Sequence, residues 1–107
     1  MNIISGVTTV STAGTAVRIN NTKHVVIRMY VHVLDSNSGP VYLGDSDVSG
    51  TGTLSGLEIH ESASSRDESP LEINFTGAGG HGGLLFEDLW LDAENNGDKL
   101  SWLAVTK

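Results

Sequence analysis

The sequence predicts an all-β protein, a β-sandwich of the jelly-roll type with about eight short antiparallel strands and no substantial helix. Three observations predict this fold class. Residues 23–34 alternate between apolar and polar side chains over the length of a long strand. Shorter alternating runs recur along the chain, and clusters of Gly, Asn, Asp and Ser separate them. No apolar pattern with the period of a helix is sustained anywhere.

The stretch Lys23–Leu34 (KHVVIRMYVHVL) is the longest predicted strand. Its polar positions include Arg28, Tyr30 and His32, which we expect on the face turned away from the core. Val26 is an exception, an apolar residue in the polar phase. The apolar face needs a second sheet to cover it, which favours a sandwich. The residues expected to face inward are Val25, Ile27, Met29, Val31 and Val33.

The other predicted strands are short and end at turn residues. Segment 84–92 is expected to carry a β-bulge, because its apolar phase slips around Glu87 and Asp88. Asn96-Gly97 predicts a tight hairpin before the last strand. These strands are, in chain order, Val7–Val10, Thr15–Asn20, Val41–Gly44, Leu57–Glu61, Leu71–Thr76, Leu84–Asp92 and Leu100–Val105. Their expected inward-facing residues include Val17, Ile19, Leu57, Ile59, Leu71, Ile73 and Phe75.

The first residues, Met1–Ser5, include two adjacent apolar side chains, Ile3 and Ile4. Terminal residues fray unless other parts of the structure hold them. We therefore expect either a short edge strand or an arm that docks on a neighbouring molecule. The predicted domain organisation is an N-terminal arm, residues 1–5, followed by a single β-sandwich domain, residues 6–107.

The composition excludes several classes of function. The formal net charge of −7 opposes binding to phosphate backbones, so we expect no nucleic-acid partner. The sequence contains neither a basic amphipathic helix nor a long apolar run, so we expect no membrane partner. The N-terminus lacks the features of a signal peptide, and the chain has no cysteine, so we expect synthesis in a cytoplasm and no disulfides. Stability must then come from core packing, oligomerisation or both.

The candidate metal and cofactor motifs are incomplete. Asp45-x-Asp47 begins like a calcium loop, but Gly56 stands where the loop requires an acidic residue. Asp92-x-Glu94 has the same defect. The Gly-rich run 77–83 lacks the Lys and Ser/Thr of a phosphate-binding loop. We expect no cofactor and no metal, and surface positions for the histidines, which are His24, His32, His60 and His81.

Catalytic motifs are also absent, so we expect that the protein is not an enzyme; a hydrolase would need a carboxylate pair that only the fold could create. The two tryptophans have different predicted roles. Trp102 is expected in the core. Trp90 alternates with Asp88 and Asp92, which places it on a polar face, where an exposed aromatic ring often marks an interface or a sugar-stacking platform. Tyr30 has the same interpretation.

Two segments carry a resemblance to a known group of proteins. Gly39–Ser49 (GPVYLGDSDVS) resembles a "G-x-V-Y-[VL]-G-D-S-x-V-S" run. Asp88–Ala93 (DLWLDA), followed by Asn96-Gly97-Asp98 and Leu100–Leu103, resembles a "D-L-x-x-[VIL]-D-A…N-G-D-x-[VL]" ending. Together they are similar to small virion proteins of tailed bacteriophages, including capsid decoration, or cement, proteins. The resemblance covers about half the chain, and residues 55–83 have no part in it.

The resemblance implies a function for the chain as a bacteriophage virion structural protein. It implies a jelly-roll-like domain that associates with itself, often as a homotrimer, and binds the major capsid protein on the outer capsid surface of the virion. No catalytic residue is implied. Alternatives are a carbohydrate-binding module, in which Trp90 and Tyr30 stack on sugar rings, and a phage tail or receptor-binding component. The residues expected to bind partners are Met1, Asn2, Ile3, Ile4, Tyr30 and Trp90.

Overall fold

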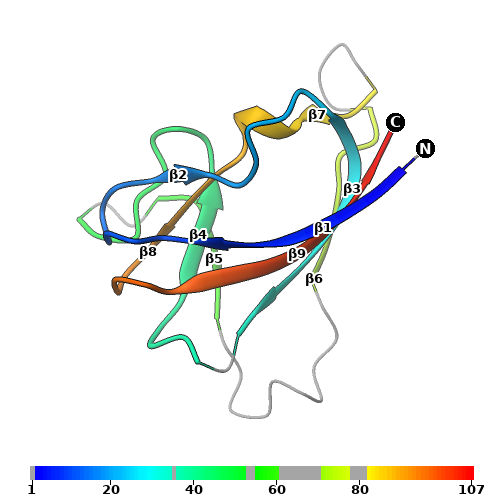
Figure 1. The fold of residues 1–107 in the computed structure, drawn as a ribbon. Coiled ribbons are helices and arrows are strands. Elements are labelled where there is room, and N and C mark those ends of the chain that lie inside the picture. Colours follow the sequence, from blue (N-terminus) through cyan, green and yellow to red (C-terminus); the bar gives the residue numbers. More distant parts are fainter. Residues whose placement is uncertain (1, 35, 53–54, 61–70, 78–81) are drawn as a thin grey trace.

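The computed structural model describes residues 2–34, 36–52, 55–60, 71–77 and 82–107. Within these residues the chain forms nine strands in two antiparallel sheets and no α-helix, which confirms the predicted all-β, sandwich-like fold (Figure 1). None of the described segments forms a helix that is long and apolar enough to cross a membrane.

The two sheets contain five and four strands. The five-stranded sheet, here called sheet A, has the order β1 (Asn2–Thr9), β9 (Lys99–Thr106), β3 (Val25–Val33) and β6 (Leu71–Asn74), and β7 (Leu84–Leu85) also pairs with β3. The four-stranded sheet, sheet B, has the order β2 (Val17–Arg18), β8 (Trp90–Ala93), β4 (Val41–Gly44) and β5 (Leu57–Ile59). The finer assignment to a jelly roll stays a prediction.

The core lies between the two sheets and contains the side chains that both sheets turn inward. Trp102 is buried there, as predicted, and its ring meets Phe86 edge to face at 5.0 Å between centroids. The Trp102 indole N–H donates a hydrogen bond of 2.9 Å to Thr8, whose hydroxyl donates in turn to the Ile19 carbonyl. These two bonds fasten β1 to the core. The fully buried apolar residues include Val10, Val26, Met29, Val41, Phe86, Leu91, Ala93, Leu100 and Ala104.

Strand β3 corrects the predicted inward phase at its beginning. Met29, Val31 and Val33 are buried as expected, but Val25 and Ile27 are only partly buried and Val26 is fully buried. The register with β9 shifts between Val26 and Arg28, so Ile27 is the additional residue of a β-bulge. The Ile27 carbonyl accepts a hydrogen bond from the backbone of Phe75 instead, at 2.7 Å. The bulge therefore reverses the phase, and Val26 faces the core.

Segment 84–92 is not the single bulged strand that its pattern predicts. Strand β7 ends at Leu85, a 3₁₀ turn (η3) covers Phe86–Asp88, and β8 begins at Trp90. The Leu89 N–H closes this turn on the Phe86 carbonyl at 3.2 Å. The turn moves the chain from sheet A to sheet B and places the Phe86 ring in the core. The slip in apolar phase was therefore real, but its cause is the change of sheet.

The N-terminal residues belong to an edge strand. β1 runs from Asn2 to Thr9 and pairs with β9 along its whole length, and Figure 1 shows the two chain ends side by side. Of the two alternatives for residues 2–5, the edge strand is the one that the structure contains. Met1 lies outside the described residues. The strand passes through the expected boundary between residues 5 and 6 without a break.

The remaining predicted strands are confirmed in place, although β2, β5 and β6 are shorter than predicted and β9 extends one residue further at each end than the predicted Leu100–Val105. Val41–Gly44 has the predicted bounds, and the inward positions of Val17, Ile19, Ile59, Ile73 and Phe75 are confirmed by burial or by packing on the core. Leu57 and Leu71 were expected inward but are 48% and 43% exposed. They lie on β5 and β6, the last strands of their sheets, where less of the opposite sheet covers them. Residue 61 and loop residues 62–70 lie outside the described residues.

Candidate interaction surface

The side chains that sheet A turns away from the core form a broad surface, here called the outer face. On β1 these are Ile3, Ser5 and Val7, which alternate with the more buried Ile4, Gly6 and Thr8. Strand register aligns them with β9 and β3 in rows across the sheet. The rows are Ile3–Val105–Arg28, Ser5–Leu103–Tyr30 and Val7–Ser101–His32.

The part of the outer face over β1 and β9 carries exposed apolar side chains beside Ser5 and Ser101. Of the five large apolar side chains that are exposed among the described residues, three lie here: Ile3 at 68%, Val7 at 55% and Leu103 at 37%. Val105 is half-buried between Ile3 and Arg28 in its row. We call Ile3, Val7, Leu103 and Val105 the apolar strip. Exposed apolar residues that are contiguous in this way mark interaction sites more often than scattered ones do.

Sequence reasoning identified Ile3 but missed the other three residues of the apolar strip. The signal was present in the last strand. If Trp102 faces the core, its neighbours Leu103 and Val105 must alternate with it and face solvent. The sequence pattern predicts that Val7 begins a separate strand, whereas β1 runs without a break from Asn2 to Thr9 and places Val7 on the same face as Ile3.

A shallow depression of about 410 Å³ lies at the middle of the outer face. Ser5, Tyr30, Ser101 and Leu103 are among its lining residues, which come from three neighbouring strands. Because all of the lining belongs to one sheet, the depression is open and does not enclose a ligand.

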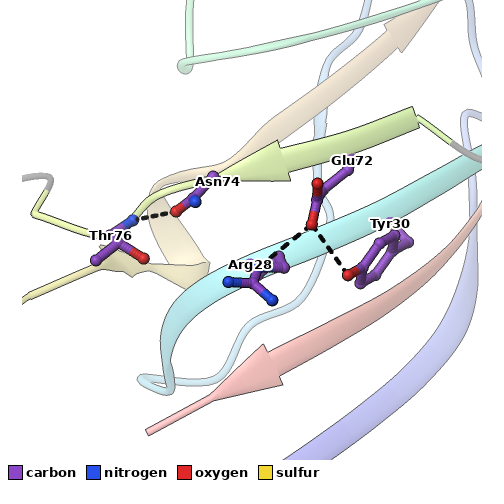
Figure 2. A network of polar contacts seen from close by, with 5 residues as sticks. All are labelled: Arg28, Tyr30, Glu72, Asn74 and Thr76. Atoms are coloured by element: carbon purple, nitrogen blue, oxygen red, sulfur yellow. Dashed lines mark hydrogen bonds and ion pairs between the residues drawn. The ribbon is translucent and has the colours of Figure 1, made fainter.

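The part of the outer face over β3 and β6 is polar (Figure 2). The Tyr30 hydroxyl donates a hydrogen bond of 3.0 Å to Glu72 Oε2, and Arg28 Nε lies 3.4 Å from the same oxygen. The ion pair is 44% and 50% exposed, so its contribution to stability is small. The hydrogen bond to Glu72 orients the Tyr30 ring, which lies beside Leu103 of the apolar strip. At the end of β6, the Thr76 N–H donates to Asn74 Oδ1 at 2.8 Å.

The predicted N-terminal binding residues occupy two environments. Ile3 belongs to the apolar strip, whereas Ile4 points inward and packs against the core. The Asn2 side chain is exposed, and its carbonyl accepts a hydrogen bond from the Thr106 hydroxyl at 3.4 Å. Of this group, Ile3 is the residue that the strand presents for a contact through the outer face.

Trp90 lies on sheet B, on the opposite side of the sandwich from Tyr30. It pairs with Arg18 across β2 and β8, and the Arg18 guanidinium stacks 5.0 Å from the centre of the indole ring. The structure therefore does not bring Trp90 and Tyr30 together. A sugar platform built from both rings, as a carbohydrate-binding module would use, is not formed.

The Asp92 carboxylate is fully buried and binds two loops. The Gly14 N–H donates to Oδ1 at 3.0 Å, and the Gly50 N–H donates to Oδ2 at 2.8 Å. Gly50 is required for this approach, because a Cβ there would lie 2.4 Å from the backbone of Ala93. Both oxygens are engaged by hydrogen-bond donors, so Asp92 is a structural anchor.

Asp98 anchors the chain in the same way. It is 3% exposed and accepts hydrogen bonds from the Ser38 and Gly39 N–H groups at 2.9 and 3.1 Å. The segments that carry the bacteriophage resemblance are thus neighbours in space, because β4 also pairs with β8. Asp92 and Asp98, two of the acidic residues in those segments, hold loops in place through these hydrogen bonds.

Sheet B also contains a buried phenol. The Tyr42 hydroxyl donates a hydrogen bond of 3.0 Å to Glu94. Burial raises the pKa of Tyr42 to about 12, and the Glu94 hydrogen bond and the charge of Glu58 act in the same direction. Tyr42 therefore stays protonated near neutral pH and is not a general base. The Glu58 carboxylate also lies against the exposed His60 imidazole, at 2.5 Å between Oε2 and Nε2.

Metal-binding geometry is not found in the described part of the chain. No group of three or more His, Asp or Glu side chains there is arranged to hold an ion. Asp45 instead accepts a hydrogen bond from the Asp47 N–H at 2.9 Å, which is an Asx-turn contact. His24 and His60 are exposed, and His81 lies outside the described residues.

No family model, curated protein or solved structure matches this chain. The outer face offers an exposed apolar strip with an oriented aromatic ring beside it, which is suited to binding a protein surface.

Proposed function

We propose that this chain is a bacteriophage virion structural protein, a capsid decoration protein that binds the major capsid protein on the outer capsid surface as an oligomer. The observation that carries the proposal is the apolar strip on the outer face of sheet A. Ile3 and Val7 expose more than half of their surface there, on a strand whose other residues hold it firmly to the core. Such a surface is costly in water unless a partner covers it.

Three further features support the proposal. The two segments around β4 and β8 resemble virion proteins of tailed bacteriophages. The strand orders β1-β9-β3-β6 and β2-β8-β4-β5 support a jelly roll, because consecutive strands repeatedly change sheet. The net charge of −7 suits the outside of a shell, away from packaged DNA.

Binding through the apolar strip would gain free energy mainly from burial. Ile3 and Val7 would each contribute on the order of 1–2 kcal/mol if a partner covered their exposed surface. An oligomer binds a repeating coat surface at several points at once, so modest contacts per subunit give tight attachment.

Co-sedimentation with capsids tests the proposal. Purified chain is mixed with capsids of the encoding phage from which this protein has been removed, and the bound fraction is measured after gradient centrifugation. We expect Val7→Ser to lower binding strongly, because it removes an apolar side chain from the strip. Leu57→Ser is the matched control, since Leu57 is similarly exposed but lies on sheet B.

The comparison of the two variants decides the outcome. Both must keep the melting temperature of the parent to within a few degrees for the result to bear on binding. Equal binding by Val7→Ser and the parent would contradict attachment through the outer face. Retention of the parent on a glycan column, with no binding to capsids, would favour the carbohydrate-binding alternative.

A further inference from the structure

β1 has an open side. It is the first strand of sheet A and pairs with β9 along one side, and no other described strand pairs with it. An edge strand presents backbone N–H and C=O groups that a further strand can bind. The sequence and register of β1 show which groups these are.

The odd-numbered residues of β1 direct their backbone groups to the open side. In an antiparallel ladder, alternate residues of one strand share hydrogen bonds with the same neighbour. The Val10 N–H donates to the Asp98 carbonyl at 2.9 Å, in continuation of the register between β1 and β9. Even-numbered residues therefore bond to β9. Ile3, Ser5 and Val7 have their N–H and C=O groups on the other side.

Nothing in β1 protects this open side from another strand. Native edge strands are usually protected by charged side chains, proline, bulges or short length. Residues 2–9 (NIISGVTT) contain no charged residue and no proline, and all eight pair with β9 in uninterrupted register. Each chain carries a net charge of −7, but β1 itself has no charged side chain. Two chains could therefore meet along β1 without repulsion between like charges at the contact.

We propose that β1 pairs antiparallel with β1 of a second copy of this chain, with Ser5 opposite Ser5 at a two-fold axis. In this register Ile3 of one copy lies opposite Val7 of the other on the outer face, so apolar residues meet. On the inner face Ile4 lies opposite Gly6. Gly6 has no room for a side chain of its own, because a Cβ would lie 2.9 Å from the Trp102 ring.

The β1 sequence is thus self-complementary about Ser5, which favours a second copy over an unrelated strand. The pairing would close the open edges of both copies and extend sheet A across the axis. It would also bring the two apolar strips together into one band. The pair has two-fold symmetry, whereas the resemblance to decoration proteins implies a trimer. The inference does not depend on the proposed attachment to a capsid.

Disulfide formation tests the register. The chain has no cysteine, so Ser5→Cys introduces a single thiol. At the two-fold axis the two Cα atoms at position 5 would be about 5.5 Å apart, within the range of a disulfide. Val7→Cys is the matched control on the same strand and face. In the proposed register the two residues at position 7 are four residues apart along the strand, about 13 Å.

We expect mild oxidation at micromolar concentration to convert most of the Ser5→Cys protein, but little of the Val7→Cys protein, into covalent dimer. Equal cross-linking of the two variants, or none of Ser5→Cys, would overturn the inference. Capsids are not needed for this test. Its failure would therefore leave the proposed function standing, and loss of capsid binding would leave the pairing standing.

A second test removes the backbone donor. Ser5→Pro deletes an N–H on the open side without taking a hydrogen bond from β9, and edge strands tolerate proline in that position. We expect sedimentation equilibrium to give twice the 11.3 kDa chain mass for the parent and for the control Ser5→Thr. For Ser5→Pro we expect the dimer dissociation constant to rise by about tenfold or more. Its circular dichroism spectrum should be unchanged. A monomeric parent, or a trimer unaffected by Ser5→Pro, would contradict the pairing.

Discussion

Replacing Asp92 by Asn tests whether the acidic residues of the resembling segments are structural anchors. The substitution keeps the size of the side chain and exchanges one carboxylate oxygen for an NH₂ group. Asp92 now accepts hydrogen bonds from the backbone N–H groups of Gly14 and Gly50. The new NH₂ group would face one of these two donors. A donor would then face a donor in a fully buried place.

The expected loss of stability follows from these contacts. A hydrogen bond to a charged group is worth about 1.5–3 kcal/mol, and a buried donor without a partner costs about 1–3 kcal/mol. The variant keeps one of the two bonds, so we expect unfolding to become easier by roughly 2–4 kcal/mol. For a domain of this size that corresponds to a fall in melting temperature on the order of 10–25 °C.

Thermal and urea unfolding of the variant and of a matched control measure this loss. Asp45→Asn makes the same chemical change at an exposed carboxylate that accepts one backbone hydrogen bond, from Asp47. We expect the control to lose less than about 1 kcal/mol. If the Asp92 variant unfolds within a degree or two of the parent, the carboxylate is not an anchor. A stable Asp92 variant that no longer bound capsids would show instead that this residue acts in binding.

The remaining predictions concern the same fold. Tyr42 holds its proton up to about pH 12 in the folded chain but releases it near pH 10.0 when unfolded, so stability should fall as pH rises between these values. Urea unfolding should show this fall in the parent and a smaller one in Tyr42→Phe; identical pH profiles would contradict the prediction. Val26→Asp should cost about 3–5 kcal/mol and Ile27→Asp clearly less, because the bulge turns Val26 into the core. Equal losses would place the bulge elsewhere. Gly50→Ala should cost at least about 2 kcal/mol, because its Cβ would collide with the backbone of Ala93, and a parent-like melting temperature would refute that contact.

The sequence predicted strands well where alternation was clean. Met29, Val31 and Val33 were placed inward and are buried. The prediction failed at Val25 and Ile27, because three consecutive apolar residues fit either phase. The phase changes at the bulge in the pairing of β3 with β9, where the Ile27 carbonyl meets Phe75, and both partners are distant in sequence. Such a contact cannot be read from a local pattern.

The candidate surface was predictable only in part. Ile3 and Tyr30 were named, but their presence on one face follows from β9 pairing with both β1 and β3. Trp90 is only partly exposed beneath Arg18, Asp92 of the same predicted face is buried, and this face belongs to the other sheet. Local periodicity gives the direction of a side chain within its strand. It does not give the order of strands within a sheet, which decides which side chains meet.

The copy number of this chain in purified virions tests the central claim most directly. Particles released by the bacterium that carries the gene are purified by density gradient, and the chain is quantified against the coat protein by mass spectrometry. A decoration protein that binds a repeating coat surface should be present in a fixed ratio to the coat protein, with many copies per particle. A few copies per particle would indicate a tail component, and absence from the particles would contradict a virion role altogether.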